Sequence, residues 1–407
     1  MPSWAAQGDL SVGACGFSGN DVTSLAKPHK IRVMHIITHL DLGGAEGVAM
    51  QLVEGLAGEA DSAVFAVLRD KTLSTIGADM AARAQKLGVP VFYGTGRGFK
   101  SGGVVLAALA LAKAVRRFRP DVLHVHTEIP ELTLAVACTL SPRVARTPLL
   151  RTVHNSVLWI AWGGIGRWVT RRLAHGTAVA CSQAAAESDA AIAAGVERPR
   201  AEVIYNAVTP PPVVTPRLSP APPPAPFRLL FAGRLVEQKG ADLLPAILQQ
   251  AQALASRQDV VVTVAGEGTL HAELTQAFAQ TKGHWQVEMV PPIARLSHHL
   301  GDYDAVLQPS RFEGFGLFQL EVLMAGLPLI TCLAPGLAEV LPDGYPLATE
   351  PGDTAALAQA LAKLVDDPDS HRRAATTYRA ALVERFAPAP MLAAYLHTYR
   401  ACAGAQT

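Results

Sequence analysis

Residues 309–328 read PSRFEGFGLFQLEVLMAGLP. The apolar run at 305–307 just before them predicts a buried strand, and a glycine-rich turn follows it. Apolar periodicity then predicts a helix over 317–325, since Gly326 suits a left-handed helix cap and Pro328 prevents the helix from continuing. The stretch therefore predicts a strand, a loop and a helix N-terminus, where unpaired N–H groups and the helix dipole favour an anion.

Two carboxylates flank this predicted anion site. Glu313 lies in the loop, and Glu321 follows eight positions later, about one turn into the helix. Carboxylate oxygens accept hydrogen bonds from vicinal hydroxyls, so the pattern favours a cradle for a sugar attached to a phosphate. The residues alone leave a second interpretation open, in which both are ordinary solvated carboxylates.

The length and composition predict a globular protein of two domains. The chain has 407 residues, of which half are hydrophobic and 17% are charged, and this balance excludes a disordered chain. Its five cysteines are widely separated, so we expect reduced thiols and neither a disulfide framework nor a zinc site. Residues 1–29 lack a basic start followed by an apolar core, and no apolar run reaches the roughly 18 residues of a membrane span, so we expect neither a signal peptide nor a transmembrane helix.

The net charge of +1 conceals an asymmetry between the two halves of the chain. Up to residue 226 there are 22 Lys and Arg against 16 Asp and Glu, and beyond it there are 13 against 18. A basic first half indicates an anionic partner there. The excess is too small and too scattered for a nucleic-acid-binding surface, so we expect no nucleic acid partner.

Strand and helix patterns alternate along most of the chain, which predicts parallel sheets covered by helices on both faces. Nine of the seventeen residues at 210–226 are proline, which predicts a semi-rigid linker between two domains. The Asp302-x-Asp304 pair directly precedes a predicted buried strand, so we assign it to structure and expect no metal ligand there.

The Glu313-x7-Glu321 spacing, with Pro309-Ser310 before it and Gly314 to Gly316 within it, resembles the signature of retaining, nucleotide-sugar-dependent glycosyltransferases of family 4. The resemblance implies an α/β protein of the GT-B fold, with two Rossmann-like, doubly wound parallel-sheet lobes facing a central cleft. It also implies retention of the anomeric configuration, no metal requirement and no cofactor beyond the nucleotide-sugar substrate. The organisation expected on this basis is a disordered tail at 1–29, an acceptor domain at 30–209, the linker at 210–226, a donor domain at 227–385 and a closing helix at 386–407 that packs back on the first domain.

In the first domain the resemblance implies three functional places. Gly43 and Gly44 follow the first predicted strand, where the family brings a loop close to the donor's sugar and diphosphate. His126 follows the strand at 122–125 and matches the second histidine of the family's P-D-h-h-H-x-H segment, so we expect it to be catalytic and to point into the cleft. A single histidine at a strand end is otherwise more often structural. His154 ends the next strand and is expected near the acceptor.

In the second domain, Arg234 and Lys239 match the family's diphosphate-binding motif, G-R-x-x-x-x-K-G. Either residue alone also fits a surface salt bridge. A planar guanidinium fork and an ammonium point charge suit phosphate oxygens, so we expect both to be catalytic, with Glu313 holding the sugar hydroxyls. The further donor-binding residues implied by the resemblance, at the base, the anion-binding loop and the ribose, are Gly266, Glu267, Gly314, Phe315, Gly316, Leu317 and Glu321.

Residues 159–172 combine tryptophan with arginine, holding Trp159, Trp162, Arg167, Trp168, Arg171 and Arg172. This composition is typical of a helix at an anionic membrane surface, and a core helix with a solvated basic face explains it equally. We expect a cytoplasmic protein that, on the first interpretation, lies peripherally on the inner face of the membrane.

Together these features predict a retaining glycosyltransferase that moves a sugar from a UDP- or GDP-sugar to a glycan or lipid-linked acceptor. Two alternatives stay open, namely a GT-B-type nucleotide-sugar epimerase and a non-catalytic sugar-nucleotide-binding protein. Release of nucleoside diphosphate only in the presence of an acceptor excludes the epimerase, and donor binding without turnover for any acceptor identifies the binding protein.

Overall fold

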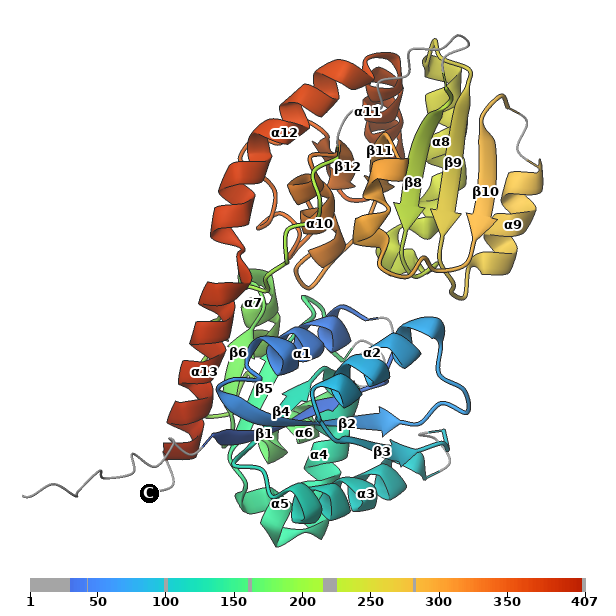
Figure 1. Cartoon of the computed structure of the whole chain (residues 1–407). Coiled ribbons are helices and arrows are strands. Elements are labelled where there is room, and N and C mark those ends of the chain that lie inside the picture. Colours follow the sequence, from blue (N-terminus) through green and yellow to red (C-terminus); the bar gives the residue numbers. More distant parts are fainter. Residues whose placement is uncertain are drawn as a thin grey trace, which may run out of the picture. The chain divides into compact units, whose positions relative to one another are not determined.

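The computed structural model describes residues 30–41, 43–98, 102–159, 163–214, 225–280 and 283–404. The tail expected at 1–29 and most of the linker expected at 210–226 lie outside these residues. The described chain builds two all-parallel sheets, each with its own helices (Figure 1). The two Rossmann-like lobes expected from the sequence are confirmed, and we call them the first and second lobe.

The first lobe contains a seven-stranded sheet in the order β3-β2-β1-β4-β5-β6-β7. Its strands are rich in Val, Ile, Leu and Ala, as a parallel sheet with both faces covered requires. Their bounds are β1 (Ile31–Ile37), β2 (Ala60–Leu68), β3 (Val91–Thr95), β4 (Val122–His126), β5 (Leu149–Val153), β6 (Thr177–Ala180) and β7 (Glu202–Val203).

The helices of the first lobe divide between the two faces of this sheet. On one face α3, α4, α5 and α6 bury apolar side chains against Phe65, Leu123 and their neighbours, and on the other face lie α1 and α2. The helices are α1 (Gly44–Gly55), α2 (Thr75–Lys86), α3 (Gly103–Phe118), α4 (Glu128–Leu140), α5 (Pro142–Arg146), α6 (Gly163–Arg172) and α7 (Gln183–Ile192).

The second lobe contains a six-stranded sheet in the order β10-β9-β8-β11-β12-β13. Its strands are β8 (Phe227–Ala232), β9 (Val260–Ala265), β10 (Gln286–Val290), β11 (Ala305–Gln308), β12 (Leu329–Cys332) and β13 (Ala348–Thr349). Its helices are α8 (Leu244–Leu254), α9 (His271–Gln280), α10 (Leu317–Ala325), α11 (Thr354–Asp366) and α12 (Pro368–Arg385), with short 3₁₀ turns that include η2 (Glu237–Lys239). As expected, Asp304 is structural, because its carboxylate accepts from the Arg228 backbone N–H and from the Arg372 guanidinium.

Each sheet has one point at which the strand order reverses direction, between β1 and β4 in the first lobe and between β8 and β11 in the second. Ligands of open parallel sheets bind beyond the carboxyl ends of the strands at such a point. In the second lobe, the loops that leave this point carry Arg234, Lys239 and Glu313. The topology therefore brings together residues that are far apart in the sequence.

The last two helices divide between the lobes. Helix α12 packs against α10 of the second lobe, and α13 (Pro388–Gly404) lies along the first lobe against β1, β4 and β5 (Figure 1). Tyr395 and Tyr399 of α13 are fully buried in the same apolar cluster as Val33 and Leu150 of the sheet. No helix in the described part of the chain is both long and apolar enough to cross a bilayer.

Candidate active site

Glu313 lies in the loop that connects β11 to α10. Its carboxylate accepts hydrogen bonds from Lys239 Nζ at 2.7 and 2.8 Å, from Ser310 Oγ at 2.7 Å and from Gln319 Nε2 at 3.1 Å. Burial alone raises the pKa of a carboxyl, but the Lys239 ammonium and these hydrogen bonds outweigh it and hold the pKa of Glu313 below its usual value. Glu313 is therefore an ionised carboxylate held in one orientation.

Lys239 reaches Glu313 from the turn that follows β8. Lys239 ends η2, and Gly240 follows it in the left-handed region at φ 69°. The α carbon of Gly240 lies so close to the Pro309 carbonyl that a side chain there would collide with it. The ammonium carries three N–H donors, and the two Glu313 oxygens engage it over two short contacts. The arrangement leaves donor capacity on Lys239 for one further acceptor.

Arg234 lies at the start of the same turn but does not join the Lys239–Glu313 pair. Its guanidinium is exposed and donates to Gln238 Oε1 at 2.8 Å. The Gln238 amide in turn donates to the Phe312 carbonyl at 3.3 Å, one residue before Glu313. Arg234 is therefore connected to the Glu313 loop through Gln238, with its guanidinium open to solvent.

Gly266 and Glu267 lie beside this turn, after β9. The Leu235 backbone N–H donates to the Glu267 carbonyl at 2.8 Å, and the α carbon of Gly266 faces the Gly233 carbonyl with no room for a side chain. The Glu267 side chain is exposed. The structure thus places both predicted donor-binding residues next to Arg234.

Glu321 lies on α10, which begins after Gly316 and spans the predicted residues 317–325. Its side chain is half-buried and has no hydrogen-bond partner among the described residues, and burial raises the pKa of this carboxyl to about 7. Glu321 therefore differs from Glu313 in that no cation compensates its charge. The Phe315 ring is buried against Tyr205 and Phe386, which leaves its backbone N–H as the group predicted to meet the donor.

The Glu313 loop also contacts the first lobe. The α carbon of Gly314 lies so close to the His154 carbonyl that any side chain would overlap it, and the Gly314 carbonyl accepts from Ser182 Oγ at 2.6 Å. A Cβ at Gly44 would lie 3.6 Å from the Leu317 side chain. The structure therefore brings His154 and Gly44 to the predicted anion-binding loop.

The N-terminus of α1 is occupied by the chain's own carboxylate. Glu46 folds back over Gly43, where its carboxylate fills the space that a Cβ at Gly43 would take. Burial raises the pKa of Glu46, and nearby backbone N–H groups and His39 oppose the rise. A diphosphate can reach the amides at this helix end only if Glu46 moves, a constraint that the Gly43-Gly44 pattern did not indicate.

Four histidines form a buried row on the face of the first sheet that α1 and α13 cover. His126 Nδ1 lies 3.0 Å from His154 Nε2, and His126 Nε2 lies 3.3 Å from His35 Nδ1. Burial lowers the pKa of His35 and of His154 to about 3. Burial, together with repulsion from the neighbouring histidines, lowers the pKa of His124 and of His126 well below its usual value. All four rings are therefore neutral at physiological pH.

His126 is placed differently from the expectation that it points into an open cleft. Its side chain is fully buried, and both ring nitrogens are engaged by His35 and His154. His154 lies at the end of the row, beside Gly314, and its Nδ1 has no hydrogen-bond partner among the described residues. In this structure His126 therefore offers a ligand no free ring nitrogen.

Tyr395 and Tyr399 are site neighbours that the sequence analysis missed. The Tyr399 hydroxyl lies 2.8 Å from His124 Nδ1, and the Thr152 hydroxyl lies 2.7 Å from His124 Nε2 and 3.1 Å from the Tyr395 hydroxyl. The two tyrosine contacts join residues more than 240 positions apart in the chain, so no local pattern could have indicated them. Tyr399 and Thr152 together fix both nitrogens of His124.

One group of described residues has the spacing of a metal site. His35, His124 and His126 each offer a ring nitrogen within 4.8 Å of the others. Metal binding requires an available lone pair, and in this structure both nitrogens of His124 and both nitrogens of His126 are engaged in hydrogen bonds. The trio can hold a metal only if those hydrogen bonds break.

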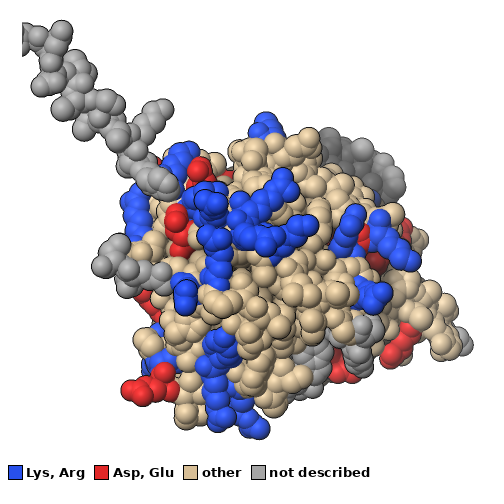
Figure 2. All heavy atoms as spheres, turned by 90° about the horizontal axis from the view of Figure 1, so that it is seen from below, with Lys and Arg blue, Asp and Glu red and all other residues tan. Residues whose placement is uncertain are grey.

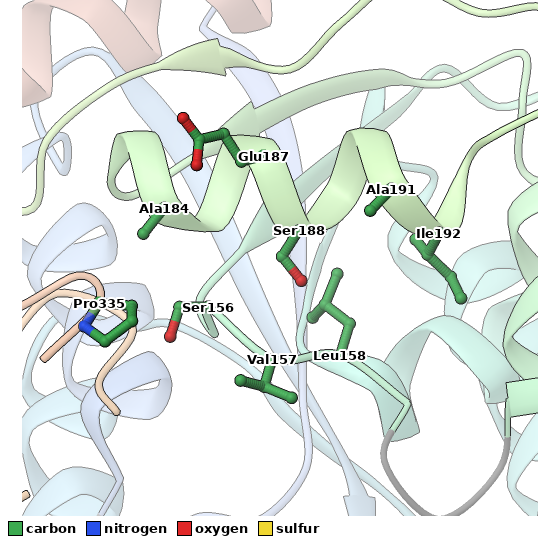
Figure 3. A pocket seen from close by; sticks show the side chains of 9 residues that line it. All are labelled: Ser156, Val157, Leu158, Ala184, Glu187, Ser188, Ala191, Ile192 and Pro335. Carbon is green, nitrogen blue, oxygen red and sulfur yellow. The ribbon is translucent and has the colours of Figure 1, made fainter. Parts of the chain in front are cut away.

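An open pocket of about 590 Å³ adjoins this site (Figure 3). Its floor is the loop after β5, its opposite wall is α7, and Pro335, whose carbonyl accepts from the Glu313 N–H at 3.0 Å, closes one end. The Ser156 hydroxyl in this pocket is buried without a partner in the described structure. The lining combines hydroxyl and carboxylate groups with an aliphatic wall: Ser156, Val157, Leu158, Ala184, Glu187, Ser188, Ala191, Ile192 and Pro335.

Comparison with protein-family models matches both halves of the chain. Residues 42–211 match the model described as "Glycosyltransferase Family 4", and residues 218–381 match the one described as "Glycosyl transferases group 1". The glycogen synthase of Mycobacterium tuberculosis H37Rv is 28% identical over 346 residues, which cover 79% of this chain and 76% of that protein. The D-inositol 3-phosphate glycosyltransferase of Kineococcus radiotolerans is 35% identical over 171 residues, or 38% of this chain and 39% of that one.

Solved structures share the architecture at low sequence identity. HepE from Anabaena, crystallised with UDP and glucose, superposes with a TM-score of 0.72 at 18% identity, covering 91% of this chain and all of that chain. Sucrose-phosphate synthase from Thermosynechococcus elongatus gives a TM-score of 0.72 at 16% identity, covering 92% of this chain and all of that chain. With both family models, the curated relatives and the two-sheet topology in agreement, the chain is a glycosyltransferase with the GT-B fold.

Proposed function

We propose that this protein is a retaining transferase of family 4, which moves a sugar from a nucleoside diphosphate sugar to a glycan or lipid-linked acceptor. The observation that carries the proposal is the contact of Lys239 with the buried Glu313 carboxylate at the strand-order reversal of the second sheet. A fixed cation and a fixed carboxylate in contact suit a ligand that presents phosphate oxygens beside sugar hydroxyls. The UDP complexes of HepE support a UDP-sugar as the first donor to test, with a GDP-sugar as the second.

The leaving diphosphate gains most of the negative charge in sugar transfer, so fixed positive charge near it lowers the barrier. Lys239 has donor capacity beyond its contacts with Glu313, and the exposed Arg234 guanidinium on the same turn can reach an incoming phosphate. The N–H groups at the start of α10 add a helix N-terminus. In this proposal no metal and no cofactor is required, and transfer persists when EDTA is present.

Glu313 orients the sugar through its hydroxyls, and Glu321 binds the ribose. His154, whose backbone lies against Gly314, is the histidine that meets the reacting groups, and His126 positions its ring. This division of roles follows from the burial of His126 and modifies the role that the family resemblance implies for it.

The pocket beside His154 is the proposed acceptor site (Figure 3). Its hydroxyls suit the sugar part of an acceptor, and the aliphatic side chains of Val157, Leu158 and Ile192 suit an apolar part, which favours a lipid-linked acceptor. In this proposal a cytoplasmic protein meets such an acceptor at the inner face of the membrane.

The test is a donor screen in which UDP-, GDP- and ADP-sugars are mixed with candidate acceptors and nucleoside diphosphate release is measured. Proton NMR of the product then reports whether the anomeric configuration is retained. We expect Glu313→Ala and Lys239→Ala each to lower turnover by at least about tenfold, since losing a charged contact costs roughly 1.5–3 kcal/mol. The control is Lys363→Ala, an exposed lysine on α11 of the same lobe.

Acceptor-dependent nucleotide release excludes an epimerase. Near wild-type turnover of both active-site variants would contradict the proposal. Inversion of the anomeric configuration would rule out the retaining mechanism but not the transferase activity.

A further inference from the structure

Three helices of the first lobe carry basic residues and no acidic residue. The sequences of α3, α5 and α6 contain no Asp or Glu. Exposed cations on them are Lys113, Arg116, Arg117, Arg143, Arg146, Arg167 and Arg171. The excess positive charge of the first half of the chain is therefore concentrated on these helices.

The same helices expose large apolar side chains. On α3 the exposed fractions are 45% for Val105, 42% for Leu106 and 52% for Leu109, and on α6 they are 44% for Ile165 and 43% for Trp168. Single exposed apolar residues are common, but five on helices of one layer leave a mixed apolar and basic surface. We call these five residues, with the seven cations above, the basic–apolar face.

The helices that form this face lie on the same side of the first sheet. Their inner sides contribute to one apolar cluster with β1, β2 and β4, and α3 and α6 both pack against α4. Lys and Arg gather over the first lobe in the view from below, with few Asp and Glu among them (Figure 2). The outer sides of α3 and α6 therefore point away from the sheet on one side of the lobe.

Carboxylates of the described residues do not neutralise most of the cations of this face. Among the described residues, no carboxylate forms an ion pair with Lys113, Arg116, Arg117, Arg143, Arg167 or Arg171. Elsewhere in the same lobe, Arg83 pairs with Glu54 and Asp79, and Arg151 pairs with Glu131. Cations without a carboxylate partner and exposed apolar side chains therefore occur together on this face.

The surface is not the one that residues 159–172 alone indicated. Trp159 is buried at 6% exposure, with its ring against Gly166, and Arg172 donates to the Cys138 carbonyl at 2.6 Å. Trp162 lies outside the described residues. Trp168, Arg167 and Arg171 remain on the surface, and α3 supplies three of the five exposed apolar side chains.

We propose that the basic–apolar face docks on an anionic lipid bilayer. Cations near an anionic leaflet are attracted to it, and adjacent apolar side chains gain by leaving water for the acyl boundary. A polyanion such as RNA satisfies the charges but leaves the apolar side chains in water, so the bilayer is the favoured partner. The proposal concerns this surface alone and does not depend on which sugar is transferred.

Vesicle flotation tests the proposal with the full chain. We expect binding to vesicles of phosphatidylcholine with about 30% phosphatidylglycerol, little binding to phosphatidylcholine alone, and loss of binding as salt rises from about 0.1 M to about 1 M. Each cation near an anionic leaflet adds roughly fivefold to binding, so Arg116→Ala/Arg117→Ala is expected to lower the vesicle partition coefficient roughly 30-fold. The matched control, Lys363→Ala/Arg373→Ala, removes two exposed cations from the second lobe and is expected to bind normally.

A second measurement examines the apolar part of the surface. Brominated acyl chains quench a tryptophan that reaches the boundary, so we expect quenching in the wild type and a smaller effect in Trp168→Phe. Equal partitioning of the Arg116/Arg117 variant and its control would overturn the proposal, as would binding that ignores lipid charge. RNA binding at the same salt, with no vesicle binding, would also overturn it and assign the surface to a polyanion.

Discussion

His126 Nδ1 and His154 Nε2 lie 3.0 Å apart, and His126 Nε2 lies 3.3 Å from His35 Nδ1. A neutral imidazole has one N–H, so His126 donates to one neighbour and accepts from the other. The hydrogen bonds therefore run in the same direction along His35, His126 and His154. The tautomer of His154 depends on that of His35, although His126 lies between the two rings. Since burial lowers the pKa of both end rings to about 3, this dependence holds throughout the physiological pH range.

Substitution of His35 tests this chain of rings. An asparagine amide occupies roughly the position of Nδ1, the atom that meets His126, whereas a glutamine amide occupies roughly that of Nε2. We expect His35→Asn to keep kcat within about threefold and His35→Gln to lower it roughly tenfold with the donor KM unchanged, because only the second variant loses the hydrogen bond. Steady-state kinetics measure both, and ¹⁵N shifts of the His154 ring report its tautomer without requiring activity.

Equal melting temperatures of the two His35 variants are the control, since they exclude unfolding as the cause of lost turnover. If Asn and Gln behave alike in kinetics and in the His154 ring shifts, the three rings do not act as one chain.

Lys239 and Glu313 are expected to contribute unequally to stability. Glu313 is 5% exposed, and the Lys239 side chain is 20% exposed. Lys239→Ala leaves a buried carboxylate with only Ser310 and Gln319 as donors, and we expect it to lower the free energy of unfolding by about 3 kcal/mol. Glu313→Ala leaves a partly hydrated ammonium and is expected to cost less, as urea unfolding at pH 7 measures.

The Lys239→Ala/Glu313→Ala double variant completes a thermodynamic cycle for this pair. It is expected to be less destabilised than the sum of the single variants, because it leaves neither charge buried alone. Strict additivity would contradict a direct interaction between the two side chains.

The contribution of Glu321 to the stability of the folded protein depends on pH. Its pKa of about 7 in the folded state exceeds the ordinary value of 4.5, so the folded protein binds more protons than the unfolded chain between these pH values. Its contribution therefore makes the protein less stable as pH rises from about 4.5 to about 7. We expect Glu321→Gln to raise the melting temperature at pH 8 and to leave it unchanged at pH 4, as differential scanning fluorimetry at both pH values measures.

The same Glu321→Gln variant is expected to bind the nucleotide several-fold more weakly if Glu321 holds the ribose, because an amide oxygen is a poorer acceptor than a carboxylate. A gain in stability together with a loss of affinity would show that the unpaired charge is retained for its ligand. A melting temperature that shifts equally at both pH values would refute the raised pKa.

Tyr399 is predicted to stabilise the first lobe through one hydroxyl. Tyr399→Phe removes the partner of His124 Nδ1 and keeps the ring, so we expect a loss of about 1–2 kcal/mol in the free energy of unfolding. Tyr378→Phe, which changes a half-buried tyrosine on α12, is the control and is expected to cost less than 1 kcal/mol. Equal losses in the two variants would mean that the His124 contact contributes nothing specific.

Local patterns predicted the local structure well. Helix α10 has the predicted bounds because its apolar periodicity, Gly326 cap and following Pro328 all act within a few residues. The turn that carries Arg234 and Lys239 was likewise found from its spacing. These features depend on short-range sterics and hydrogen bonding, which a sequence window contains.

Relationships between distant segments could not be predicted in the same way. The Lys239–Glu313 contact joins residues 74 positions apart, and the Tyr399–His124 contact joins residues 275 positions apart. The burial of His126 depends on helices that arrive from other parts of the chain, and the burial of Trp159 depends on the later Gly166. The resemblance supplied the candidate residues, and only the packed structure indicates which of them touch.

Helix α13 has a consequence for how this protein is made. Its two buried tyrosines cover the histidine row and the apolar residues around Leu150. In a nascent chain that surface is therefore exposed to water while the second half is still being translated. The first lobe can therefore bury this surface only once α13 has been synthesised, because the contacts that cover it join residues more than 240 positions apart.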